Sequence, residues 1–490
     1  MSKNRMYNEY FPPYKAAIDA GAATVMTSFN DINGVPATAN KWLLTDVLRK
    51  EWGFKGFVVT DFTAIKELKA HGLGDEQKVA ARALKAGTDM DMVGEDYLKT
   101  LKKSVQENLV SEEEINRACQ RVLEMKYNLG LFDDPYRYLD EKRLKTDILT
   151  PENRKAAREI AVQTFVLMKN KNQALPLKKT DKIAFIGPLL DDKANMPGTW
   201  SVVVDSKESV TLKNALEELS EKKNFSYARG CNIIENRNLE KNSFIEFTKE
   251  HPRISAEILL KEALEKPKKA DKIVLVLGEA SEMTGESSSK TDIRFPENQL
   301  LLLREMKKLN KPVVVVLFTG RPLDLSDMID MPDSVINVWF PGIEAGHAIA
   351  DVLFGSVNPS GKLPMTFPRS VGQIPIYYNH KNTGRPLEFN DGRFEKYKSN
   401  YLDESNEPLF PFGFGLSYTS FIYGDPQFSS NQLKGNETLK VNIDVTNSGN
   451  YDGEDVVQLY IRDKEASITR PVKELKGFEK VFLKKGEQGM

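Results

Sequence analysis

Two stretches of the sequence combine carboxylates with a local pattern that supports chemistry. In residues 56–68 (GFVVTDFTAIKEL), the apolar run Phe57–Val59 predicts a short buried strand that ends at Asp61. Parallel α/β folds place reactive groups at the carboxyl ends of such strands, which makes Asp61 a candidate catalytic carboxylate. Aspartate also commonly caps a following helix, here predicted from Ala64, so the pattern leaves both roles open.

The second stretch is the loop of residues 278–296 (GEASEMTGESSSKTDIRFP), which leaves another predicted strand, Lys272–Gly278. It offers three candidate carboxylates, Glu279, Glu282 and Glu286. A long loop of small polar residues is suited to reach the site of another domain. The alternative interpretation is a solvated acidic loop.

A pair of carboxylates from two domains is the equipment for retaining glycoside hydrolysis. One carboxylate attacks the anomeric carbon, while the other protonates the leaving oxygen and then removes a proton from water. The two groups stand about 5–5.5 Å apart in enzymes of this kind.

Other chemistries lack their sequence patterns. No Walker A motif, G-x-G-x-x-G fingerprint or G-x-S-x-G elbow is present. Asp89 and Asp91 alternate with methionines on a predicted strand, which favours structural roles. We therefore expect no metal and no cofactor. The four histidines are scattered, without the i,i+4 pairing of a metal site: His71, His251, His347 and His380.

The composition fits a globular protein of about three domains. Of 490 residues, 40% are hydrophobic and 28% charged, and the formal charge is −1. This balance offers no attraction for nucleic acid or an anionic membrane and suits a neutral, polar substrate. Cys119 and Cys231 are interpreted as free thiols. The sequence shows no apolar run of membrane-spanning length and no signal-peptide core in its first residues.

The elements that would hold Asp61 alternate strands with helices. Three strand–helix units predict parallel strands with right-handed crossovers. A closed barrel needs eight such units and about 250 residues, so we expect either a small open sheet or a barrel whose beginning is missing. Ser111 and Glu114 have the spacing of a capping box. The predicted strands are 22–26, 56–61 and 87–92, and the predicted helices are 42–51, 76–86, 98–108 and 111–129.

The loop with Glu286 belongs to a second region of alternating elements. Near-continuous apolar runs between helices indicate a doubly wound, mostly parallel sheet. A helix over Pro151–Met168 is predicted to lead into it. The predicted strands are 182–187, 272–278, 312–318 and 335–340, and the predicted helices are 212–220, 254–265, 297–309 and 344–354.

The remaining chain changes character. Residues 358–418, rich in Pro, Gly and aromatics, predict a long ordered connector. Period-two alternation in residues 439–445 and 456–461, and a strand over 478–483, predict an antiparallel β-sandwich. The chain ends at Met490, before a seven-stranded sandwich would be complete, so we expect a chain cut at both ends.

Several motifs in one order resemble glycoside hydrolase family 3, and most of all its periplasmic bacterial β-glucosidases. AGAATVMTSFNDINGVPATAN, LRKEWGFKGFVVTDF and AGTDMDM resemble the last three units of the family's barrel. YARGC, PVVVVLFTGRPLDL, WFPGIEAGHAIADVLFG and NPSGKLPMTFP resemble its α/β sandwich domain, and PLFPFGFGLSYTSF resembles the entry into a fibronectin type III-like domain.

The resemblance implies an α/β multidomain protein with five parts. They are the C-terminal part of a (β/α)8 barrel over residues 1–145, a linker helix over 146–165, an α/β sandwich domain over 166–390, a connector over 391–420, and a partial fibronectin type III-like domain over 421–490.

The resemblance also implies roles for single residues. Asp61, in VVTDF, matches the family's nucleophile. Glu286, in GESSSKTDI, matches its acid/base, with Glu279 as the second choice. Aromatic side chains near the sugar sites present flat apolar faces to a pyranose ring, and the family often has Trp where this chain has Phe62. The predicted substrate-binding residues are Phe62, Trp200, Met26 and Phe29.

The function implied by the resemblance is that of a retaining exo-β-glucosidase in the periplasm or outside the cell. It would release terminal β-D-glucosyl residues from the non-reducing end of β-glucosides and oligosaccharides. One alternative is a β-xylosidase on the same scaffold. The other is a catalytically incompetent fragment, because the first half of the family's barrel, with the Lys-His motif, the Arg and the Asp that grip the innermost sugar, is not found in the sequence. Nucleic acid and membrane are not expected as partners.

Overall fold

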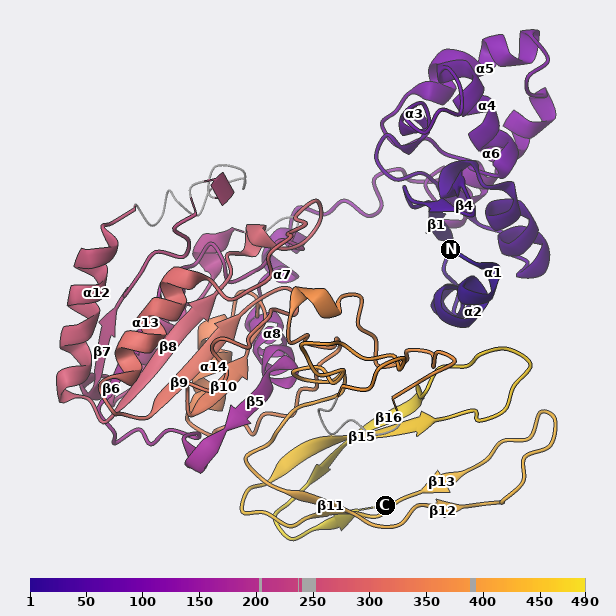
Figure 1. The fold of residues 1–490 in the computed structure, drawn as a ribbon. Coiled ribbons are helices and arrows are strands. Elements are labelled where there is room, and N and C mark those ends of the chain that lie inside the picture. Colours follow the sequence, from indigo (N-terminus) through magenta and orange to yellow (C-terminus); the bar gives the residue numbers. More distant parts are fainter. Residues whose placement is uncertain (202–204, 237, 240–252, 388–393, 490) are drawn as a thin grey trace. The chain divides into compact units, whose positions relative to one another are not determined.

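The computed structural model describes residues 1–201, 205–236, 238–239, 253–387 and 394–489. The chain forms two compact units, Met1–Thr146 and Asp147–Met490 (Figure 1). Within the described residues, none of the helices has both the length and the apolar character needed to cross a lipid bilayer.

The first unit is built on a short parallel sheet. Strand β1 (Thr24–Met26) pairs with β4 (Phe57–Val59), with Val25 opposite Val58. The third predicted strand contributes a single parallel bridge between Val59 and Met90 rather than a full strand. These three segments are parallel as predicted, and the described residues contain no closed barrel.

Helices surround this small sheet, and the capping box predicted at Ser111 is present. The Ser111 hydroxyl accepts from the Glu114 N–H at 3.2 Å, while the Glu114 carboxylate accepts from the Ser111 N–H at 2.9 Å. The larger helices are α2 (Phe11–Asp19), the π-type helix η3 (Trp42–Glu51), α4 (Glu76–Ala86), α5 (Asp96–Gln106) and α6 (Glu112–Asn128). Shorter elements are α1 (Lys3–Arg5), β2 (Asp31–Ile32), β3 (Val35–Pro36), α3 (Ala64–Glu67) and α7 (Arg143–Thr146).

The second unit contains a six-stranded sheet in the order β5-β10-β9-β8-β6-β7. All neighbours pair in parallel except β5, which runs antiparallel to β10, so the predicted mostly parallel sheet is confirmed. The strands are β5 (Val166–Asn170), β6 (Ile183–Ile186), β7 (Phe225–Ala228), β8 (Lys272–Gly278), β9 (Val313–Phe318) and β10 (Ser334–Asn337).

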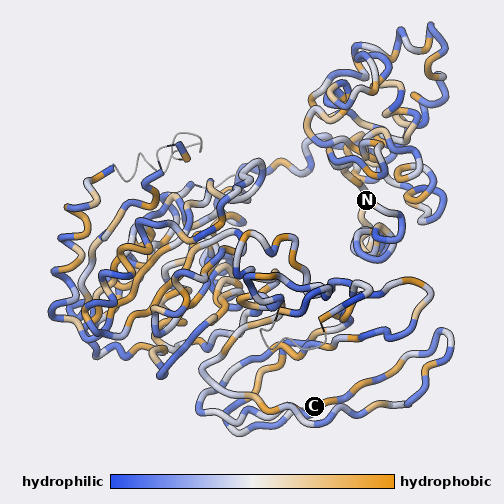
Figure 2. The backbone as a smooth tube through the Cα atoms, viewed as in Figure 1, coloured by the Kyte–Doolittle hydropathy of each residue, from blue (hydrophilic) through white to orange (hydrophobic). Residues whose placement is uncertain are grey.

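Both faces of this sheet are covered, which explains why its strands read as continuous apolar runs. Along β8, Val274 and Val276 enter one core, while Ile273, Leu275 and Leu277 enter the other. The hydrophobic colour of the central strands is visible in Figure 2. The first core is closed by α8 (Pro151–Thr164), α9 (Leu212–Glu218) and α14 (Ala345–Leu353), and the second by α12 (Ala256–Glu265) and α13 (Glu297–Lys307).

The helix predicted over Pro151–Met168 is wrong at its end. Helix α8 stops at Thr164, Phe165 is extended, and the chain continues as β5. Leu167 packs into one core, while Val166 and Met168 pack into the other. This alternation between opposite faces is possible for a strand and not for a helix.

The strand order reverses between β6 and β8, because β7 lies on the far side of β6 and the chain then crosses back to β8. In open α/β sheets the loops at such a reversal diverge and leave a crevice at the carboxyl ends of the strands, where ligands bind. Here the loop after β6 carries Trp200, and the loop after β8 carries Glu286. The topology thus groups two of the predicted site residues.

The last part of the second unit is antiparallel, as the period-two pattern predicts. The long hairpin of β15 (Gly453–Ile461) and β16 (Glu474–Leu483) is accompanied by the sheet β11-β14-β17 and the pair β12-β13. These short strands are β11 (Phe421–Tyr423), β12 (Gln427–Phe428), β13 (Val441–Asn442), β14 (Val445–Asn447) and β17 (Gln488–Gly489).

Candidate active site

Asp61 lies just beyond the carboxyl end of β4, where the backbone is tightly held. The buried Thr60 donates its N–H to the Met90 carbonyl at 3.0 Å, and its hydroxyl accepts from the Met92 N–H at 2.8 Å. The Asp61 side chain remains half-buried, with Oδ1 accepting from the Phe62 N–H at 2.6 Å.

The interpretation of Asp61 as a helix cap is wrong. The residue that caps α3 is Thr63, in the left-handed conformation at φ 56°, and no side chain accepts a hydrogen bond there. Asp61 instead bends the chain, because its carbonyl accepts from the Ala64 N–H at 3.2 Å. The carboxylate is therefore not used to start the helix.

Exposed apolar side chains surround the strand ends of the first unit. Met26 ends β1 opposite Val59, so it emerges at the same sheet edge as Asp61. Phe62 is 57% exposed, Met26 53% and Phe29 37%. Large apolar side chains beside a polar group are suited to contact the apolar face of a sugar. The structure brings these three predicted binding residues to the rim of the first unit.

Asp89 has the structural role predicted for it. Its carboxylate lies between Arg49 (2.5 Å) and Arg121 (2.6 Å) and also accepts from the Val58 N–H at 2.8 Å. Asp91 is structural as well, since its Oδ2 accepts from the Asp96 N–H at the start of α5 at 2.7 Å. Asp89 therefore anchors the strand that delivers Asp61.

In the second unit, hydrogen bonds from a side chain fix the last residue of β8, from which the loop with Glu286 starts. The buried Gln299 of α13 accepts from the Gly278 N–H at 2.8 Å and donates to the Gly278 carbonyl at 2.7 Å. Gly278 itself has φ +141°, and a Cβ there would lie 1.9 Å from the Phe318 carbonyl oxygen. Only glycine fits this turn out of the sheet.

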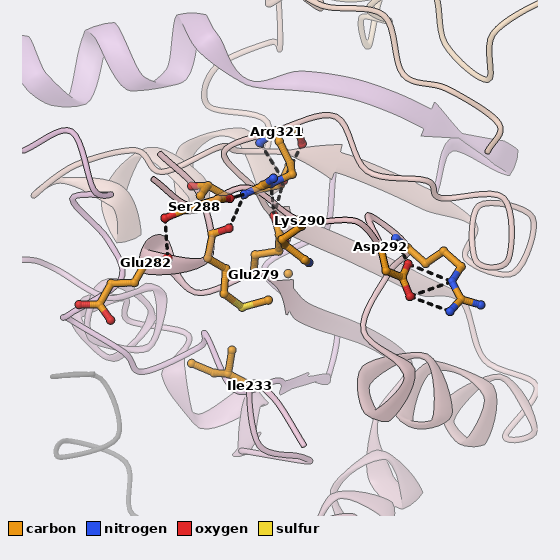
Figure 3. A network of polar contacts seen from close by, with 12 residues as sticks. Ile233, Glu279, Glu282, Ser288, Lys290, Asp292 and Arg321 are labelled. Carbon is orange, nitrogen blue, oxygen red and sulfur yellow. Dashed lines mark hydrogen bonds and ion pairs between the residues drawn. The ribbon is translucent and has the colours of Figure 1, made fainter. Parts of the chain in front are cut away.

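The three glutamates of this loop differ in environment. Glu279 is fully buried and ion-paired with Lys290 at 2.8 Å and Arg321 at 3.6 Å. Glu282 is half-buried, and Glu286 is exposed at the far part of the loop. Figure 3 shows Glu279 between its two cations. Glu286 is thus the most exposed of the three glutamates.

Another carboxylate of this segment is unsuited to donate protons. The Arg294 guanidinium binds Asp292 at 2.7 Å and lowers the pKa of that carboxyl to about 2. Asp292 therefore stays ionised across the range in which enzymes usually work.

Trp200 lies on the neighbouring loop and is 75% exposed. The loops are joined by two hydrogen bonds, from the Thr199 hydroxyl to the Thr284 carbonyl at 3.0 Å and from the Ser281 N–H to the Asn195 side chain at 2.7 Å. Gly285 allows this approach, since a Cβ there would lie 2.5 Å from the Thr199 hydroxyl. Trp200 and Glu286 are therefore carried by adjoining segments.

Asp61, Phe62, Met26 and Phe29 belong to the first unit, and Glu286 and Trp200 to the second. Lys290 and Arg321 are not among the site residues predicted from the sequence, although they stand in the quoted motifs GESSSKTDI and FTGRPL. A lysine inside a loop with an excess of carboxylates is the signal that could have pointed to Lys290.

Within the described ranges, no group of three or more His, Cys, Asp and Glu side chains has the arrangement of a metal site. Both cysteines are free thiols, Cys119 exposed and Cys231 buried. Burial raises the pKa of the Cys231 thiol to about 12, which makes it a structural rather than a reactive group.

Comparison with known proteins places these features in a family. The chain matches the family models for the glycosyl hydrolase family 3 N terminal domain over residues 1–125, the C-terminal domain of the same family over 165–418, and a fibronectin type III-like domain over 455–490.

Individual relatives agree with these matches. The chain is 46% identical to the periplasmic beta-glucosidase of Salmonella typhimurium, covering 100% of this chain and 64% of that protein. It is 37% identical to a beta-xylosidase of Formosa agariphila, covering 99% of this chain and 66% of the relative. A Listeria innocua beta-glucosidase solved with glucose has a TM-score of 0.89 and 41% identity, covering 100% of this chain and 64% of that one. The chain spans just under two thirds of the length of these relatives, and it belongs to glycosyl hydrolase family 3.

Proposed function

We propose that the protein is a retaining exo-β-glucosidase that releases terminal β-D-glucosyl residues from the non-reducing end of β-glucosides and oligosaccharides. The observation that carries the proposal is the placement of Asp61, a half-buried carboxylate at the carboxyl end of a parallel strand, beside exposed Phe62 and Met26. The similarity to a periplasmic beta-glucosidase over the whole chain supports the choice of substrate.

In the proposed mechanism the Asp61 carboxylate attacks the anomeric carbon as Glu286 protonates the departing oxygen. Glu286 then removes a proton from water, and that water displaces Asp61 from the sugar. Trp200, Phe62, Met26 and Phe29 contact the sugar rings. The exposure of Glu286 and its place after β8, at the reversal of strand order, support the acid/base role.

We further propose that residues 1–145 are the C-terminal part of a (β/α)8 barrel, 146–165 a linker helix, 166–390 an α/β sandwich, 391–420 a connector, and 421–490 part of a fibronectin type III-like domain. The parallel register of β1, β4 and Met90 supports the barrel assignment. The name of the Salmonella typhimurium relative supports a periplasmic or secreted location.

A β-xylosidase is the second candidate, favoured by 37% identity to the protein of that name. Hydrolysis of a panel of nitrophenyl glycosides distinguishes the two. Preference for the β-glucoside supports the proposal, and turnover of the β-xyloside alone contradicts it. Assaying turnover by residues 1–490 alone shows whether this stretch is catalytically competent.

The nucleophile is tested by Asp61→Asn in the full-length protein. We expect kcat to fall by roughly 10³-fold or more, because the group that forms the covalent bond is lost. A 2-fluoro-glucoside should label Asp61, as read by peptide mass spectrometry. Asp133→Asn, at an exposed aspartate, is the matched control and should leave kcat unchanged. Labelling of a different residue would contradict the assignment.

A further inference from the structure

We propose that Arg321 is a positioning residue for Glu286. Together with Lys290 and the buried Glu279 it forms an ionic cluster, called the clasp below, which holds the loop that carries Glu286. The inference rests on the proposed acid/base role of Glu286 and adds the residues that fix where that carboxylate stands.

The clasp closes the base of the loop. Glu279 directly follows β8, and its carboxylate has no exposed surface. Lys290 reaches back to Glu279 Oε1 at 2.8 Å, across eleven residues of chain. Arg321 Nε lies 3.6 Å from Glu279 Oε2, and the Thr319 hydroxyl donates to the same oxygen at 3.3 Å. The two ends of the loop are therefore joined inside the protein.

Arg321 also reaches into the loop itself. Its Nη2 donates to the carbonyls of Met283 and Ser288, the second at 2.7 Å, and these residues stand on either side of Glu286. The Ser288 hydroxyl in turn donates to the carbonyls of Glu282 and Glu286, each at 3.2 Å. Figure 3 shows Arg321 between Glu279 and the backbone near Ser288. One planar guanidinium thus holds two carbonyls and faces the carboxylate at once.

The backbone on both sides of Glu286 needs such support. Gly285 has φ +102° and Ser287 has φ 56°, so the chain is left-handed immediately before and after the glutamate. A non-glycine residue in that conformation persists only where its surroundings hold it. These two residues set the direction in which Glu286 leaves the loop, and Arg321 binds the carbonyls that bracket them.

The charges of the clasp allow Arg321 to be replaced without leaving a buried charge unpaired. Glu279 has two cationic partners, so replacing Arg321 by a neutral residue still leaves the Glu279–Lys290 pair intact at 2.8 Å. No buried charge then loses its last partner, which is the change that strongly destabilises a fold. The substitution therefore releases the loop more than it damages the core.

The test uses leaving groups that differ in their need for a proton. Departure of phenol from a β-glucoside requires protonation of its oxygen by the acid/base, whereas 2,4-dinitrophenolate leaves without it. For Arg321→Met in the full-length protein, we expect kcat/KM for phenyl β-glucoside to fall by about 10²-fold, the usual worth of general acid catalysis. The value for the dinitrophenyl glucoside should change little. Its kcat should nevertheless fall, because water needs the general base to attack the glycosyl-enzyme, and azide, which attacks without a general base, should restore that kcat.

Three further variants complete the design. Lys290→Met opens the base of the loop but keeps the Glu279–Arg321 contact. Its kcat/KM for phenyl β-glucoside should also fall more than that for the dinitrophenyl glucoside, but by a smaller factor than in Arg321→Met. Arg321→Lys keeps the charge but not the planar guanidinium, and should regain part of the loss. Arg304→Met, in an exposed ion pair on α13, is the matched control and should behave as wild type.

Equal losses of kcat/KM on the phenyl and dinitrophenyl glucosides, or no loss on either, would overturn the proposed positioning role of Arg321. A Lys290→Met variant that retains full activity on phenyl β-glucoside would overturn it as well, even where Arg321→Met does not fold. Failure of the wild-type protein to hydrolyse either glucoside instead refutes the proposed function, so the two failures are distinct.

Discussion

At the scale of single residues, Asp61 and Asp89 of the first unit show how environment separates two aspartates. Asp61 follows β4, and the Asp89 carboxylate accepts from the Val58 N–H within the same strand. Asp89 is 8% exposed and neutralised by two arginines, while Asp61 is half-buried with its carboxylate on a backbone N–H. The first arrangement stabilises a fold, and the second leaves a carboxylate available for chemistry.

This contrast gives a stability prediction for Asp89→Asn. The neutral amide leaves Arg49 and Arg121 facing each other without their shared carboxylate, and breaking a buried pair in this way costs about 3–5 kcal/mol. Denaturant unfolding should show the loss, whereas Asp61→Asn should unfold like wild type. Similar unfolding free energies for the two variants would contradict the structural role of Asp89.

At the scale of elements, the first turn of α5 contains a carboxyl group without a partner. Asp96 is fully buried, and neither of its carboxylate oxygens has a hydrogen-bond partner among the described residues. Burial and the nearby Asp91 and Glu76 carboxylates raise the pKa of Asp96 to about 6, against the opposing effect of Lys66 and Lys99. The start of this helix therefore prefers a neutral side chain.

The pH dependence follows from that raised pKa. Folded Asp96 keeps a proton that the unfolded chain loses near pH 4, so its contribution to stability falls as the pH rises from about 4 through 6. Asp96→Asn should therefore raise the unfolding free energy at pH 7.5 by about 1–2 kcal/mol, after allowance for solvent screening, and by much less at pH 4.5. Thermal unfolding at both pH values checks this. An equal effect at the two values would contradict it.

The elements recovered from the sequence are those with a strong local signal. Strand β8 was predictable to the residue because seven apolar or flanking positions stand between polar turns, and α4 because its apolar stripe has helical spacing. Strand β5 was not, because Val166–Met168 continues the apolar pattern of α8, and only pairing with β10 decides its conformation. Strand β7 could not be predicted either, because its sequence, FSYA, is short and mixes apolar with polar residues.

The candidate site divides in the same way. Asp61, Glu286 and Trp200 stand in motifs that resemble those of the family, so the sequence alone could propose them, and their roles stay predictions. Arg321 could not, because its role depends on the carbonyls of Met283 and Ser288 and on Glu279, all at least 33 residues away in the chain. Contacts to backbone atoms leave no trace in the identity of the residues contacted.

At the scale of the whole molecule, the two units are joined by a solvent-exposed segment. Every residue from 132 to 149 is exposed, including the short helix α7. Exposed connecting segments are the preferred sites of proteolytic cleavage. Each unit, by contrast, has its own buried clusters.

Brief treatment with trypsin should therefore cut first between the units. We expect N-terminal sequencing of the C-terminal fragment to begin after Arg137, Lys142, Arg143 or Lys145, all of which are exposed. Replacing these four residues with glutamine should slow the first cut. Earlier cleavage inside the six-stranded sheet would contradict the division into units.

The clamp of Gln299 on Gly278 has a practical consequence for protein engineering. Because the side chain of Gln299 holds both backbone groups of Gly278, the point where the chain leaves the sheet is fixed independently of the loop residues beyond it. Residues 280–296 therefore form a loop that starts from a firmly held backbone position. Homologous loops that keep a lysine at the position of Lys290 could be transplanted between Glu279 and Glu297 while the sheet beneath keeps its register.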